Sequence, residues 1–168
     1  MRTSQRDLDL LCTAMQIEQG GYDFYAAAAA QAKDSCGVKA FLRLARHKMD
    51  RLGKVETVLC TLTKAGGPER ARARTSREVS KFPTRGQANA SKTAGAGLTA
   101  LGEAIHAEGA VLSLYLKALD DVGAPSVRAV LKLLIEEGRR HLTMLEAEYN
   151  CIASTGFWLD DEQLRVEA

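Results

Sequence analysis

LDLLCTAMQIEQGGYDFY at residues 8–25 and LTALGEAIHAEGAVLSLY at residues 98–115 are two versions of one pattern, related by a shift of 90 positions. The shift places Glu108 on Glu18 and Tyr115 on Tyr25 and continues without a gap over residues 8–60 and 98–150. Apolar residues recur every three or four positions in both versions, which predicts an amphipathic helix for each. The chain therefore contains a repeated unit, and we expect that unit to be a pair of helices.

A glutamate interrupts the apolar face of each predicted helix. Glu18 follows Met15 by three positions, and Glu108 follows Ile105 by three positions. An ionised carboxylate inside a protein costs several kilocalories per mole unless a cation, a metal ion or a proton compensates its charge. We expect the second helix of each unit to supply this compensation.

The composition indicates one globular, all-helical domain. The chain has 168 residues, of which 46% are apolar and only three are proline, and no segment alternates apolar and polar residues as a strand would. A formal net charge of +2 gives no general bias toward nucleic acid. Since no stretch approaches the roughly 18–20 apolar residues of a membrane span and the first residues lack an apolar signal core, we expect a cytoplasmic chain without membrane contact.

We expect a ferritin-like four-helix bundle as the order of elements. The predicted segments of this single domain, residues 1–168, are helices at 4–34, 37–64, 98–121 and 125–154, a crossover at 65–97 and a tail at 155–168. Two short connections and one long crossover distinguish ferritin-like bundles from simple up-and-down bundles. The crossover is basic between residues 69 and 85, but apart from Phe82 it lacks aromatic residues for stacking on bases, so a solvated basic face is the preferred interpretation.

Several motifs resemble the rubrerythrin-type branch of the ferritin-like proteins. They are Glu18-x-x-Gly21-x-x-Phe24-Tyr25, Phe41-x-x-Leu44-Ala45, Phe82-Pro83, Glu108 seven residues before Tyr115, and Leu134 seven residues before His141. The resemblance covers nearly the whole chain and implies an oligomeric bundle that usually holds two irons and acts in peroxide reduction or related iron chemistry. The rubredoxin-like cysteine site of full rubrerythrins is absent, because the four cysteines are single and form no Cys-x-x-Cys pair.

The resemblance also implies a diiron ligand set, which this chain retains only in part. Such a site takes one Glu from each of two helices and a Glu-x-x-His pair from each of the other two. The matching ligands are Glu18, Glu108 and His141, whereas the other three positions hold Lys48, Arg51 and Gly138. Protonated lysine and arginine offer no lone pair to a metal, and glycine has no side chain.

Charge counting predicts a salt-bridge core at this place. Glu18 and Glu108 carry two negative charges, which Lys48 and Arg51 balance without metal. We hypothesise that the Lys48 ammonium lies between the two glutamates and that Arg51 forks onto one of them. Gly138 is expected to leave space for these long side chains.

The tyrosines and histidines are assigned supporting roles. Tyr25 and Tyr115 are expected to be core residues whose hydroxyls bond a glutamate, although beside a metal they would be candidates for radical or proton-relay groups. His141 is expected to touch Glu108. His47 and His106 fall beside the inward rows and are expected at the boundary or in solvent.

Two functions follow from these residues. The first is a non-catalytic structural, binding or regulatory homodimer without a cofactor, whose partner, protein or small molecule, the sequence does not identify. The alternative is a rubrerythrin-like oxidoreductase that reduces peroxide or oxidises ferrous iron at a residual site of Glu18, Glu108 and His141. Glu137 could join Glu108 and His141 to hold one iron or zinc ion, whereas a two-iron site requires a different helix register.

Overall fold

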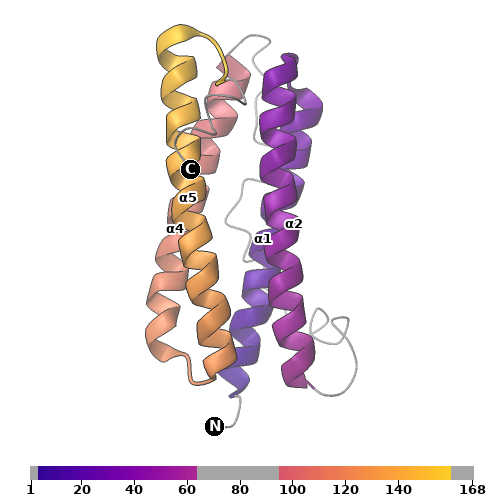
Figure 1. The fold of residues 1–168 in the computed structure, drawn as a ribbon, viewed down its shortest axis with the longest axis vertical. Coiled ribbons are helices and arrows are strands. Elements are labelled where there is room, and N and C mark those ends of the chain that lie inside the picture. The colour runs from indigo at the N-terminus through magenta and orange to yellow at the C-terminus, as the bar shows by residue number, and fades with distance from the viewer. Residues whose placement is uncertain (1–3, 64–94, 160–168) are drawn as a thin grey trace.

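The computed structural model describes residues 4–63 and 95–159, and within these ranges the chain is all-helical, without a strand. The helices are α1 (Gln5–Gln31), α2 (Ser35–Thr63), α4 (Gly95–Asp121) and α5 (Pro125–Thr155). The prediction of an all-helical four-helix bundle is confirmed (Figure 1). The expected crossover falls outside the described residues, except for residues 95–97, which belong to α4. Residues 160–168 of the tail also lie outside them.

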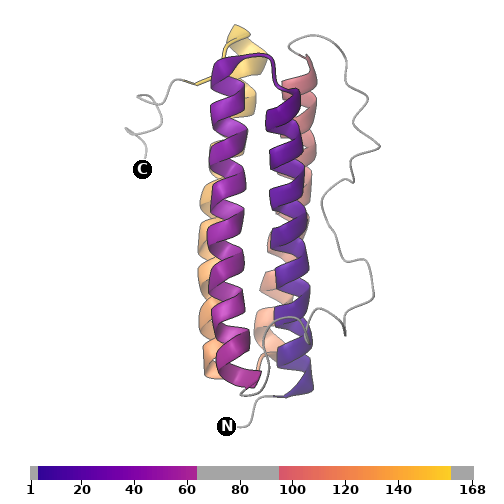
Figure 2. The ribbon, with the colours of Figure 1, turned by 90° about the vertical axis from the view of Figure 1, so that its right-hand side faces the viewer.

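The four helices form two hairpins. α1 packs on α2, and α4 packs on α5; between the hairpins, α1 contacts α4 and α2 contacts α5. α2 and α4 run in the same direction along the bundle, opposite to α1 and α5 (Figures 1 and 2). Each hairpin corresponds to one copy of the sequence repeat, so the repeated unit is a helix pair.

The core consists of the apolar faces that the repeat predicts. Equivalent positions of the two hairpins are buried together, as in the pairs Leu11 and Leu101, Ala14 and Ala104, Tyr25 and Tyr115, and Leu44 and Leu134. The packing of two similar hairpins thus places corresponding residues in one shared interior. This arrangement sends the glutamates of α1 and α4 toward the same interior.

Asp7 links the beginning of α1 to the connection between α4 and α5. Ser4 and Asp7 form a capping box, in which each side chain accepts from the other residue's backbone N–H. The Oδ1 atom of Asp7 also accepts a 3.1 Å hydrogen bond from the backbone N–H of Gly123. A buried carboxylate at 2% exposure is thereby satisfied.

The beginning of α2 differs from the expected position. The second helix was expected to begin at residue 37, whereas α2 begins at Ser35. The Oδ1 atom of Asp34 accepts hydrogen bonds from the N–H groups of Cys36, at 2.8 Å, and Gly37, at 3.1 Å. The turn-forming side chain acts as a cap on the first helical turn and moves the helix start toward the N-terminus.

The tail folds back onto its own bundle as far as Leu159. Gly156 adopts a left-handed conformation with φ of 79° and terminates α5. The Trp158 ring meets the ring of Phe41 edge to face with centroids 5.4 Å apart, and the N–H of Leu159 donates a 2.8 Å hydrogen bond to Glu148 Oε1. Among the described residues, no helix combines the length and the apolar character that crossing a membrane requires.

Candidate functional site

The middle of the bundle holds four ionisable side chains, here called the charged cluster: Glu18 of α1, Glu108 of α4, and Lys48 and Arg51 of α2. None of these residues is more than 2% exposed. Water therefore cannot compensate the charges, which must balance one another. α2 supplies both cations from positions one helical turn apart, and each hairpin supplies one anion.

Lys48 lies between the two glutamates. Its Nζ atom is 2.7 Å from Glu108 Oε1 and 3.3 Å from Glu18 Oε2. Both distances are within ion-pair range, and the shorter one is also in the range of charge-assisted hydrogen bonds, which are stronger than neutral ones. One ammonium group thus connects carboxylates from different hairpins.

Arg51 also reaches both glutamates. Its Nη2 atom is 3.0 Å from Glu18 Oε1, and its Nη1 atom is 4.0 Å from Glu108 Oε2. The hypothesis that Arg51 forks onto a single glutamate is therefore wrong, because its two Nη atoms lie near different carboxylates. A Cβ atom at Gly138 would lie 3.9 Å from Nη2, so a side chain longer than methyl would compete with the guanidinium for space.

Two tyrosines cross between the hairpins. Tyr25 of α1 donates a 3.2 Å hydrogen bond to Glu108 Oε1 of α4, and Tyr115 of α4 donates a 2.9 Å bond to Glu18 Oε1 of α1. Burial raises the pKa of both phenols well above its ordinary value, and the nearby glutamates raise it further. Each hydroxyl therefore keeps its proton and donates a hydrogen bond to a carboxylate.

The charges of the cluster reinforce one another. Burial by itself would raise the pKa of Glu108, but Lys48, His141 and Arg51 together hold that pKa far below its ordinary value. Burial by itself would lower the pKa of Arg51, whereas the charges of Glu18 and Glu108 raise it. The charged cluster thus contains two carboxylates and two cations, whose charges sum to zero.

His141 lies at the edge of the charged cluster and also contacts His47, for which no partner was expected. Its Nδ1 atom lies 3.9 Å from Glu108 Oε1, and its Nε2 atom lies 2.7 Å from Nδ1 of His47. His47 is half-buried at the boundary. A signal for this contact existed, because His47 precedes Arg51 by one helical turn and therefore shares its face of α2.

Glu137 does not join Glu108 and His141. Its carboxylate pairs with the ammonium group of Lys54 in a partly exposed position, and His106 is exposed on α4. Over residues 4–63 and 95–159, no group of three or more His, Cys, Asp or Glu side chains is arranged to hold a metal ion. The ligand set that the single-metal alternative requires is thus not assembled.

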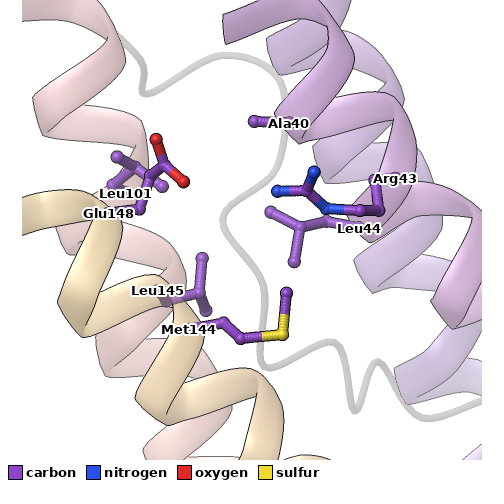
Figure 3. A pocket seen from close by; sticks show the side chains of 7 residues that line it. All are labelled: Ala40, Arg43, Leu44, Leu101, Met144, Leu145 and Glu148. Atoms are coloured by element: carbon purple, nitrogen blue, oxygen red, sulfur yellow. The ribbon is translucent and has the colours of Figure 1, made fainter. Parts of the chain in front are cut away.

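A small cavity lies between α2, α4 and α5 (Figure 3), and no residue of the charged cluster lines it. Its lining residues are Ala40, Arg43, Leu44, Leu101, Met144, Leu145 and Glu148. The cavity has a volume of about 10 Å³, which is about the space that one water molecule requires. It is too small for an organic substrate.

Comparison with known proteins places the chain by its fold only. No protein-family model matches the sequence, and no curated protein matches it either. The structure is similar to that of a hypothetical protein from Pyrococcus furiosus, with a TM-score of 0.66 and 19% identity over 88% of this chain and 90% of the other. This likeness supports the four-helix arrangement and carries no information on function.

Proposed function

We propose that this chain is a ferritin-like protein of the rubrerythrin type in which the charged cluster stands where the family has its diiron centre. We propose further that it acts as a non-catalytic structural, binding or regulatory protein. The observation that carries the proposal is the position of Lys48 Nζ within ion-pair distance of Glu18 and Glu108. These are the two carboxylates that the family resemblance assigns to the metals.

The topology supports the ferritin-like part of this proposal. α2 and α4 run in the same direction (Figure 2), whereas a bundle with only short connections alternates the direction of successive helices. One long crossover between two hairpins is the ferritin-like connectivity. The chain leaves residues 64–94 for that connection.

The residues present do not fit a diiron centre. Glu18 and Glu108 direct their oxygens to Lys48, Arg51 and two tyrosine hydroxyls, so their negative charge is already compensated. A divalent ion at this point would approach two fixed cations at short range. Peroxide reduction and ferrous iron oxidation need a redox metal with open coordination positions, and this donor set does not provide its ligands.

We also propose that the chain forms a homodimer, as the family resemblance implies. Apolar side chains remain exposed on α2 at Leu42 and Met49, with 53% and 43% of their surfaces accessible. Sedimentation equilibrium of the full chain gives the association state directly. A mass equal to that of one chain at all concentrations would refute the dimer.

Metal content tests the main proposal. Wild-type protein is produced in iron-supplemented medium and purified without oxygen and without a metal-chelating column. The matched variant restores the family ligands through the substitutions Lys48→Glu, Arg51→His and Gly138→Glu. We expect no iron in the wild type and about two irons per chain in the variant, because the restored set has the ligands of a diiron bundle.

Two results would overturn the proposal. About two irons per wild-type chain would restore the oxidoreductase with an unusual ligand set. Peroxide consumption by iron-loaded wild-type protein, abolished by Glu108→Gln, would have the same meaning. If the restored variant does not fold, the metal content and peroxide assay of the wild type still decide between the two functions.

A further inference from the structure

His47 and His141 bring two imidazole nitrogens from different helices to one point. Nδ1 of His47 on α2 lies 2.7 Å from Nε2 of His141 on α5. The ring planes are inclined by 26°, with centroids 4.8 Å apart. When both rings are neutral, only one of these nitrogens carries the proton of the hydrogen bond, and the other offers a lone pair.

We infer that this histidine pair, His47 with His141, is a binding site for a divalent transition-metal ion of the nickel or copper class. Imidazole nitrogen is a preferred ligand of these ions. Two cis ligands at about 2.0 to 2.1 Å from a square-planar metal lie about 2.9 Å apart, whereas two tetrahedral zinc ligands lie about 3.3 Å apart. The distance between the two nitrogens therefore has to increase less to bind Ni²⁺ or Cu²⁺ than to bind Zn²⁺. In either case the rings must also turn so that both lone pairs point at the metal.

The two ring nitrogens of His141 face different partners. The Nδ1 atom of His141 faces Glu108, whereas its Nε2 atom faces His47. A metal ion at the histidine pair thus occupies the outer side of the His141 ring and leaves the Lys48 contacts intact. His47 is only partly buried.

The described residues provide no third His, Cys, Asp or Glu ligand here, so water completes the coordination shell and the affinity is that of a two-imidazole site.

Calorimetric titration with Ni²⁺ tests the inference. The untagged full chain is used with its cysteines alkylated, because three of the four thiols are not buried and thiolates bind the same ions. The variants are His47→Ala and His141→Ala, with His106→Ala as the matched control, since His106 is exposed on α4. We expect one Ni²⁺ per chain in the wild type and in the control, and an affinity loss of more than about tenfold in both other variants.

The alternative outcomes are distinct. Equal affinity in wild type and His47→Ala, or no Ni²⁺ binding by the wild type, would overturn the histidine-pair site and leave the proposed function standing. Binding that survives His47→Ala but is lost in Glu108→Gln would place the metal in the charged cluster and overturn both. Because His141 is buried and its replacement could disturb the fold, His47→Gln with an unchanged helical circular dichroism spectrum serves as the second variant.

Discussion

Tyr115 on α4 donates its hydroxyl proton to Glu18 on α1 over 2.9 Å. The equivalent bond of the other repeat runs from Tyr25 on α1 to Glu108 on α4 over 3.2 Å. In each repeat the tyrosine follows the glutamate by seven residues, yet neither tyrosine serves the glutamate of its own helix. The two hairpins therefore satisfy each other's buried carboxylates, and neither hairpin alone can bury its glutamate with the same partners.

Removal of either glutamate should strongly destabilise the fold. Glu18→Ala or Glu108→Ala leaves Lys48 and Arg51 with excess buried positive charge, and breaking a buried pair from one side commonly costs about 3 to 5 kcal/mol. Urea unfolding followed by circular dichroism measures the loss. Glu136→Ala, at an exposed position of α5, is the control and should unfold like the wild type. A midpoint unchanged in both core variants would show that the charged cluster does not contribute to stability.

The acid limb of stability should depend on Glu108. In the folded chain the pKa of Glu108 lies far below its ordinary value of 4.5. Below pH 4.5 the unfolded chain therefore binds a proton that the folded chain excludes. The stabilisation is fully present above pH 4.5 and is lost as the pH falls through the folded pKa. Urea midpoints measured from neutral pH downward should fall less steeply in Glu108→Gln than in the wild type.

Asp7 is the comparison for that experiment. Burial would raise its pKa, but hydrogen bonds from Ser4, Gly123 and Ala124 lower it below its ordinary value. Asp7→Asn should therefore remove a further part of the acid dependence. An acid limb that is the same in wild type, Glu108→Gln and Asp7→Asn would contradict the assignment of both groups.

Alkaline stability should depend on the two buried tyrosines. Their pKa values are raised well above 10.0, so above that pH the unfolded chain loses phenolic protons that the folded chain retains, and the free energy of unfolding falls. This contribution is fully present below pH 10 and is lost as the pH rises toward the folded pKa. In an alkaline titration followed at the phenolate absorbance band, the wild type should show a component at high pH from these two tyrosines. The Tyr25→Phe, Tyr115→Phe double variant should lack that component. A phenolate signal that rises without loss of helical structure and is unchanged in the double variant would contradict the prediction.

Trp158 should report on the glycines beneath it. A Cβ atom added at Gly97 or at Gly37 would approach the indole to 2.8 or 2.7 Å, which forces the ring to move because real Cβ contacts are longer. Gly97→Ala should therefore shift the fluorescence of this single tryptophan toward that of a solvent-exposed indole. Gly53→Ala meets nothing within 4 Å and should instead stabilise α2 by about 0.5 to 1 kcal/mol. An unchanged emission spectrum in Gly97→Ala would show that the tail does not pack there in solution.

The amino-acid sequence by itself determined the helices, the repeat and the inward direction of both glutamates. These features depend on local geometry, because helical periodicity assigns each residue to a face. The inward positions of Lys48, Arg51 and Gly138 could be predicted in the same way, since the repeat supplies the register. The predicted starts of the helices were less accurate, because a single side chain can decide whether a segment caps a helix or interrupts it. Asp34, which caps the first turn of α2, is the example.

Only the tertiary structure decided which side chains meet across helices. The structure shows that Arg51 approaches both glutamates and that His47 contacts His141. It also shows that Glu137 pairs with Lys54 and that Trp158 packs against Phe41 of its own chain. Each of these contacts joins residues far apart in sequence. Such contacts depend on the rotation and spacing of packed helices and on the rotamers of long side chains. Periodicity alone specifies a face of a helix and leaves the partner on the neighbouring helix open.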